Sequence, residues 1–162
     1  MSLKNQFNAD LRDAMRAGDE TRKSTLRMLI TAVRNAEIPP EREEAAPGDG
    51  PQRIDLDDEA VRDVVRKEVK QRRDSIDVYT KANRGDLAAK EEAEVAVLAA
   101  YLPQQMSRAE IETSALAVIQ RVGATGPADK GKVMPALMAE LRGRAEGREI
   151  NAVVTELLSQ QT

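Results

Sequence analysis

Five basic residues near the end of the chain have the chemistry to bind an anion. They are Lys130, Lys132, Arg142, Arg144 and Arg148. Arginine presents a planar guanidinium that can donate two parallel hydrogen bonds to a phosphate, and a helix N-terminus adds a positive field. Gly143 and Gly147 lie among the arginines, and a residue without a Cβ lets an anion approach the backbone closely. This pattern indicates a binding site for a polyanion rather than a catalytic site.

The same stretch also contains four acidic residues, so its net charge is only +1. They are Asp129, Glu140, Glu146 and Glu149. A solvated turn with no ligand is therefore the alternative interpretation of these residues.

A second basic face is expected on a long helix in the middle of the chain. Residues 62–84 hold eight basic residues against four acidic ones, whereas residues 41–59 have a net charge of −6. Arg62, Arg66, Lys70 and Arg73 represent this face, and Arg72 belongs to the same basic run. Such a face can follow a nucleic-acid backbone, or it can simply keep a helix soluble.

Catalysis and metal binding have little support in the composition. The chain has no histidine and no cysteine, which removes the commonest general base and the usual zinc ligands. Adjacent carboxylates such as Glu91 and Glu92 point in different directions on a helix and do not converge. We therefore expect no cofactor, no metal and no enzymatic activity of the chain's own.

The elements that position these residues are expected to be helices, because strand-favouring aromatic residues make up only 2% of the chain. Apolar spacing predicts helices over residues 3–17, 20–38, 58–84, 87–102, 108–122, 130–142 and 148–159. The expected N-caps are Ser2, either Asp57 or Asp58, Asp86, Ser107 and Asp129. Pro135 lies inside one of these helices and should kink it or delay its start.

The fold class is therefore all-α, in two parts. Residues 1–102 predict an N-terminal domain resembling a four-helix bundle, and residues 103–162 predict a three-helix domain, with a joint at Tyr101–Pro103. Residues 39–54 combine prolines, glycines and acids with almost nothing to bury, and predict a mobile acidic linker. No apolar run approaches the roughly 20 residues that cross a bilayer, and a secretion signal is not evident, so a cytoplasmic protein without a membrane segment is expected.

Several short motifs resemble a known family. They are KANRGDL from Lys81, YLP from Tyr101, GKVM from Gly131, RGRAEG from Arg142, and Asn151. With these motifs the chain resembles the GatB/YqeY family over its whole length, and in particular its stand-alone YqeY-like members. The family's characteristic residues fall on Gly131, Lys132, Val133, Met134, Gly143, Ala145 and Asn151.

The end of the chain is similar to the tail domain of the GatB chain of the aspartyl/glutamyl-tRNA amidotransferase, which binds tRNA. The resemblance implies an accessory protein that binds tRNA, acting alone or beside an aminoacyl-tRNA synthetase or the amidotransferase. The amidotransferase is a carbon–nitrogen ligase with glutamine as amido-N-donor, but this chain lacks its catalytic body. Aromatic residues are too few to stack on bases, so recognition of tRNA is expected through backbone and shape. The alternative is a helical adaptor that binds another protein, with Met134 and Met138 as candidate contacts.

Overall fold

The computed structural model describes residues 1–39 and 53–161, and all regular structure within these ranges is helical. The expectation of an all-α fold is confirmed. The chain divides into two compact units, Met1–Leu102 and Pro103–Thr162. The linker predicted at residues 39–54 lies for the most part outside the described residues.

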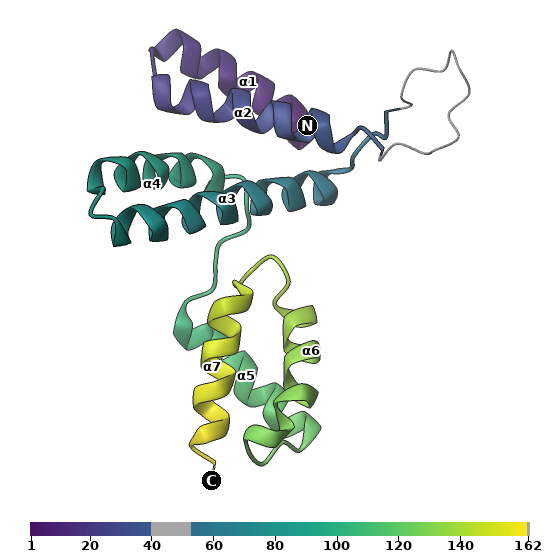
Figure 1. Ribbon diagram of the computed structural model, residues 1–162. Helices are drawn as coiled ribbons and strands as arrows, with labels where there is room; N and C mark the ends of the chain where they lie inside the picture. The colour runs from purple at the N-terminus through teal and green to yellow at the C-terminus, as the bar shows by residue number, and fades with distance from the viewer. Residues whose placement is uncertain (40–52, 162) are drawn as a thin grey trace. The chain divides into compact units, whose positions relative to one another are not determined.

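The N-terminal unit begins with a tight helical hairpin (Figure 1). Helix α1 (Leu3–Ala17) starts where the Ser2 side chain accepts a hydrogen bond from the backbone of Asn5. It ends at Gly18, whose φ of 68° is the left-handed conformation that glycine adopts without strain. Helix α2 (Glu20–Ala36) follows at once, capped by Asp19. The short connection makes the two helices antiparallel neighbours.

A second hairpin completes this unit. Helix α3 (Asp58–Lys81) is capped by Asp57, which accepts a hydrogen bond from Ala60 N at 2.8 Å, and helix α4 covers Gly85–Ala99. We expected α3 to close at Gly85 and Asp86 to cap α4, and both expectations are wrong. Asn83 takes the left-handed conformation instead, with φ of 55°, and α4 already begins at Gly85. Asparagine tolerates this region better than most residues, so the turn closes two residues earlier.

The core of the N-terminal unit is built mainly from α1, α2 and α3, with α2 packed against both α3 and α4. Its buried members are Leu3, Phe7, Leu26, Leu29, Val33, Val61, Val65, Val69, Leu98 and Tyr101. The rings of Phe7 and Tyr101 meet edge to face, with centroids 4.8 Å apart. Met15 lies on the same predicted apolar face as Leu3 and Phe7 but is 52% exposed, so the buried face of α1 becomes narrower toward its end.

The C-terminal unit consists of helices α5 (Arg108–Val122), α6 (Lys130–Glu140) and α7 (Gly147–Ser159), each of which packs against the other two. The 3-10 turn η1 (Pro127–Asp129) precedes α6. The expected N-cap Ser107 is confirmed and forms a capping box, in which Ser107 and Glu110 exchange hydrogen bonds with each other's backbone. The buried core is entirely apolar: Ile111, Ala115, Val118, Ile119, Ala124, Val133, Leu137, Leu141, Ile150, Val153, Val154 and Leu158.

Helix α6 runs through Pro135 rather than starting after it. The expectation that proline delays the helix is therefore wrong. Pro135 cannot donate to the carbonyl of Gly131, but Gly131 is exposed and water can satisfy that carbonyl. Asp129 precedes α6 but makes no side-chain cap bond, because its carboxylate accepts a hydrogen bond from Thr125 N at 2.9 Å.

Candidate nucleic-acid interface

Three of the five predicted cations come together at the connection between α6 and α7. We call this segment, residues 141–148 with Arg142, Arg144 and Arg148, the arginine turn. All three arginines are exposed. Arg142 and Arg144 flank Gly143, whose φ of 76° is left-handed, and Arg148 lies in the first turn of α7.

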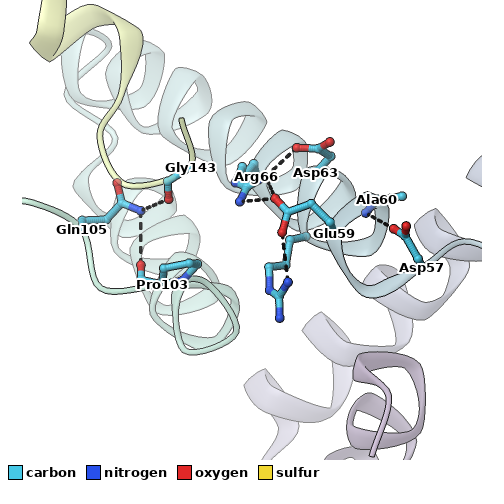
Figure 2. A network of polar contacts seen from close by, with 9 residues as sticks. Asp57, Glu59, Ala60, Asp63, Arg66, Pro103, Gln105 and Gly143 are labelled. Carbon is cyan, nitrogen blue, oxygen red and sulfur yellow. Dashed lines mark hydrogen bonds and ion pairs between the residues drawn. The ribbon is translucent and has the colours of Figure 1, made fainter. Parts of the chain in front are cut away.

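The backbone of the arginine turn is fixed from within its own unit. Leu141 is buried in the core, and its carbonyl accepts hydrogen bonds from Arg144 N at 2.9 Å and Ala145 N at 3.2 Å. The segment before α5 also binds the backbone of the arginine turn: Met106 N donates to the Arg144 carbonyl at 2.7 Å. Gln105 Nε2 donates to the Gly143 carbonyl at 3.3 Å (Figure 2). The arginine side chains therefore extend from a backbone whose path is already determined.

Lys130 and Lys132 lie at the opposite end of α6 from the arginine turn. An eleven-residue helix is about 16 Å long, so the two groups are about that far apart along its axis. Lys130 Nζ donates to Thr155 Oγ1 at 2.8 Å, and Lys132 Nζ lies 3.3 Å from an oxygen of Asp129. The five residues that the sequence placed in one site therefore occupy two places.

Acidic residues of the unit are largely paired at each end of α6. The backbone amide of Thr125 and then the Lys132 ammonium lower the pKa of Asp129 below its ordinary value. Glu140 forms an ion pair with Arg121 of α5. At the arginine turn, the positive charge of Arg144 contributes to a lowered pKa of Glu110, after the larger effect of the hydrogen bonds from Ser107. The arginine turn thus lies in a field with charges of both signs.

The remaining family residues divide into structural and exposed positions. Val133 is buried, and Met134 and Ala145 pack against the same core, so these three hold the first half of α6 and the arginine turn against it. Gly131 is exposed, with no atom within 4 Å of where a Cβ would lie. Asn151 is exposed on α7, and its carbonyl accepts a hydrogen bond from Thr155 Oγ1 at 2.7 Å.

The second basic face is an ion-pair network rather than a row of cations. Arg66 lies between two carboxylates of α3, 3.0 Å from Glu59 and 2.6 Å from Asp63 (Figure 2). Arg62 also binds Glu59, at 3.0 Å. These hydrogen bonds, from Arg66 first and Arg62 second, lower the pKa of Glu59.

The rest of this face is similar. Lys70 Nζ is 2.9 Å from Asp74, and Arg73 is half-buried. Salt bridges between helix neighbours neutralise much of the charge that the sequence displays here, which leaves the arginine turn as the better candidate.

Arg72, which we assigned to the basic run, is a core residue. Its Nε donates to Glu94 of α4 at 2.9 Å and its guanidinium binds Glu68 at 2.8 Å, with both Arg72 and Glu94 buried. Burial opposes the charge of Arg72, but the hydrogen bonds to Glu68 and Glu94 outweigh it and raise its pKa. The spacing Val65, Val69, Arg72 is that of a core stripe, so the signal for burial was present in the sequence.

Two general properties of the described residues bear on function. No group of three or more acidic side chains within residues 1–39 and 53–161 is arranged to hold a metal ion. Over the same residues, none of the helices combines the length and the apolar character that a bilayer span requires.

The model of one protein family, the Yqey-like proteins, matches residues 4–158. The chain belongs to this family. The resemblance stated from the sequence motifs is therefore confirmed for the family. The further likeness to an amidotransferase tail stays a prediction.

Curated relatives of the family are yeast proteins named "Altered inheritance of mitochondria protein 41, mitochondrial". The chain is 38% identical to the one from Lachancea thermotolerans, over 65% of this chain and 51% of that protein. It is 40% identical to the one from Eremothecium gossypii, over 57% and 45%, and 31% identical to one from Saccharomyces cerevisiae, over 65% and 51%. The matches thus span about half the length of these relatives.

The names of these relatives correct the expected cytoplasmic location, because they place the relatives in mitochondria. Our expectation was based on missing apolar segments. Such segments mark bilayer spans and secretion signals, whereas mitochondrial targeting sequences are amphipathic and rich in arginine. The absence of long apolar segments therefore does not distinguish a cytoplasmic from a mitochondrial protein.

Proposed function

We propose that this chain is an accessory protein of tRNA metabolism that binds folded tRNA through its phosphates and performs no chemistry itself. One observation supports the proposal above others: the arginine turn presents three exposed arginines on a backbone fixed by Leu141, Gln105 and Met106. A preset arrangement reduces the conformational entropy that is lost when a ligand binds. Guanidinium groups are suited to phosphate by their planar pairs of donors.

Recognition in this proposal is through backbone and shape. Phe7 and Tyr101 are buried and Tyr79 is half-buried on α3, so the three aromatic residues of the chain offer no platform on which bases stack. Phosphate contacts release bound counterions, so binding weakens as the salt concentration rises. We therefore expect low sequence specificity and a strong dependence on salt.

Catalysis would be supplied by a partner in this proposal. A synthetase or an amidotransferase acting on the same tRNA is the class of partner that the sequence resemblance suggests. A chain without histidine or cysteine has few groups that can act as base or nucleophile near neutral pH, which favours binding over chemistry.

The test is tRNA binding by fluorescence anisotropy across a series of salt concentrations. The variant is the double substitution Arg142→Ala with Arg144→Ala, which removes two phosphate contacts. The slope of log K against log salt should become shallower by about 2, at about 1 per contact, with weaker binding at low salt.

A matched control comes from the same unit. Arg108→Ala with Arg121→Ala removes the same charge from two exposed arginines that bind Glu156 and Glu140. This control should keep the slope of the unchanged protein. Equal slopes for the two double variants would remove the arginine turn from the proposal, and no tRNA binding in dilute buffer would remove the proposal itself.

A helical adaptor remains the second candidate, supported by one exposed side chain. Met138 on α6 is 41% exposed, whereas Met134 packs against the core. Flexible methionines adapt to irregular partner surfaces. Chemical crosslinking in cell extract after nuclease treatment, comparing Met138→Gln with the unchanged chain, tests this role: a crosslinked protein lost only in the variant supports it.

A further inference from the structure

A small cavity of about 190 Å³ lies between α1 and α2, where α1 begins and α2 ends. Phe7 of α1 and Ile30 and Val33 of α2 give it an apolar floor. Phe7 and Val33 are buried core residues and Ile30 packs against the same core, so the floor is part of a fixed structure. Neither the family assignment nor the tRNA proposal uses this place.

Charged side chains surround the apolar floor with an excess of positive charge. Lys4, Arg34 and Arg53 line the cavity against a single carboxylate, Glu37. Lys4 is already engaged: its Nζ is 2.9 Å from Glu37 Oε1 and also binds Asp55. These two carboxylates, Asp55 first, raise the pKa of Lys4. Glu37 is therefore compensated by Lys4 and does not oppose an incoming anion as a lone charge would.

The two arginines differ from Lys4 in this respect. Within the part of the chain that the structure describes, the guanidinium groups of Arg34 and Arg53 make no hydrogen bond and no ion pair. Two guanidinium groups beside an apolar floor match a ligand with an anionic head and an apolar body.

We propose that this cavity binds a short amphiphilic anion. A carboxylate or phosphate monoester head binds Arg34 and Arg53, and a short hydrocarbon body lies against Phe7, Ile30 and Val33. The volume limits the ligand: 190 Å³ is below the roughly 300 Å³ of pockets for drug-sized molecules and equals about six water volumes. The proposal rests on the hairpin of α1 and α2 with Arg53 beside it, and stands independently of tRNA binding at the arginine turn.

The test is an NMR titration of the full chain with hexanoate and, separately, hexyl phosphate. The expected result is saturable shifts of the Phe7, Ile30 and Val33 amides with at least one of the two anions. Hexanol and hexylammonium should give no saturable shifts, because neither has a negative head. Inorganic phosphate should bind more weakly than hexyl phosphate, because it lacks the apolar body.

A matched pair of variants locates the head group. Arg34→Gln should weaken binding about tenfold, as expected for the loss of one charge-assisted hydrogen bond. Arg16→Gln removes an exposed arginine of α1 that pairs with Asp13, and should leave binding unchanged. Glutamine keeps the helix propensity of arginine, so both variants should fold.

Three outcomes would each overturn the proposal: no saturable shift with either anion, equal binding of hexanol, or equal affinity of the Arg34→Gln and Arg16→Gln variants.

Discussion

In the N-terminal unit an arginine and a glutamate are buried together between two helices, whereas every buried side chain described in the C-terminal unit is apolar. The N-terminal unit also buries Tyr101, whose hydroxyl donates to Asp10 at 2.5 Å. Burial first, and the Asp10 carboxylate second, raise the pKa of Tyr101. Asp10 is held in turn by Arg22 at 3.3 Å. Polar contacts thus join α1, α2 and the segment after α4 in the N-terminal unit. The core of the C-terminal unit is held by the packing of apolar side chains.

The contrast shows that basic content is a poor guide to how many cations stay exposed. Residues 62–84 have the larger positive excess, yet salt bridges within α3 and the buried Arg72 use much of it for structure. The C-terminal unit has as many acids as bases, yet three exposed arginines gather at one turn. Local placement, rather than net charge, makes the arginine turn the better candidate for an anion.

The largest effect on stability is expected from removing the buried arginine. Arg72→Ala leaves Glu94 buried without its partner, and should lower the free energy of unfolding of the N-terminal unit by about 3–5 kcal/mol. Urea denaturation followed by circular dichroism measures this loss. Glu94→Ala should cost less, because Arg72 keeps Glu68 at 2.8 Å.

The control for this experiment is Lys67→Ala, at an exposed position of the same helix, with an expected change within about 0.5 kcal/mol. If Arg72→Ala is as mild as Lys67→Ala, the buried pair does not stabilise the unit.

The corresponding test in the C-terminal unit is a substitution that leaves a cavity in its apolar core. Leu137 is fully buried on α6, and Leu137→Ala should lower the stability of the C-terminal unit by about 3 kcal/mol. Hydrogen exchange by mass spectrometry should show faster exchange within residues 103–161 only. Leu116→Ala, on a side chain 49% exposed, is the matched control and should change little. Equal effects of the two substitutions would contradict the assigned core.

A smaller effect is expected at the capping box. Ser107→Ala removes the hydroxyl that accepts from Glu110 N at 3.3 Å, and should cost about 1 kcal/mol. Thermal unfolding of the C-terminal unit measures this. Ser107→Thr, which keeps a hydroxyl, should retain most of the stability. A threonine variant as unstable as the alanine variant would show that the hydroxyl is not the stabilising group.

The smallest expected effect is the loss of stability of the C-terminal unit at low pH. Hydrogen bonds from Ser107, backbone first, lower the pKa of Glu110 below 4.5, so the folded unit binds this proton less readily than the unfolded chain. The resulting stability is present above pH 4.5 and is lost as the pH falls through the lowered value. Glu110→Gln keeps a capping side chain without the charge. The difference in urea midpoint between wild type and variant should therefore be larger at pH 6 than at pH 3, and a difference independent of pH would contradict it.

Local signals allowed much of the fold to be predicted. The caps at Ser2, Asp57 and Ser107, and the helix ends before Gly18 and Gly123, depend on residues within one helical turn of each other. The turn between α3 and α4 was misplaced because Asn83 and Gly85 can both adopt the left-handed conformation, and the sequence does not say which one does.

The candidate site was predicted only in part. The arginine turn is local, so the spacing of its three arginines in the sequence already implied that they lie on one connection. Lys130 and Lys132 are separated from it by the length of α6, which the helix prediction already implied. The pair of Arg72 and Glu94 joins residues 22 positions apart, and it depends on how α3 packs against α4. Periodicity places each residue on a face but does not identify its partner.

The geometry around Arg72 also predicts that a conservative substitution at this position would destabilise the protein. One planar group donates through Nε to α4 and through another nitrogen to both the side chain and the carbonyl of Glu68, while Met28 Sδ of α2 lies 4.0 Å away. A lysine would conserve the charge, but its single ammonium cannot reproduce donors pointing in fixed, divergent directions. Among natural variants, arginine-to-lysine exchange at this position should consequently be rare.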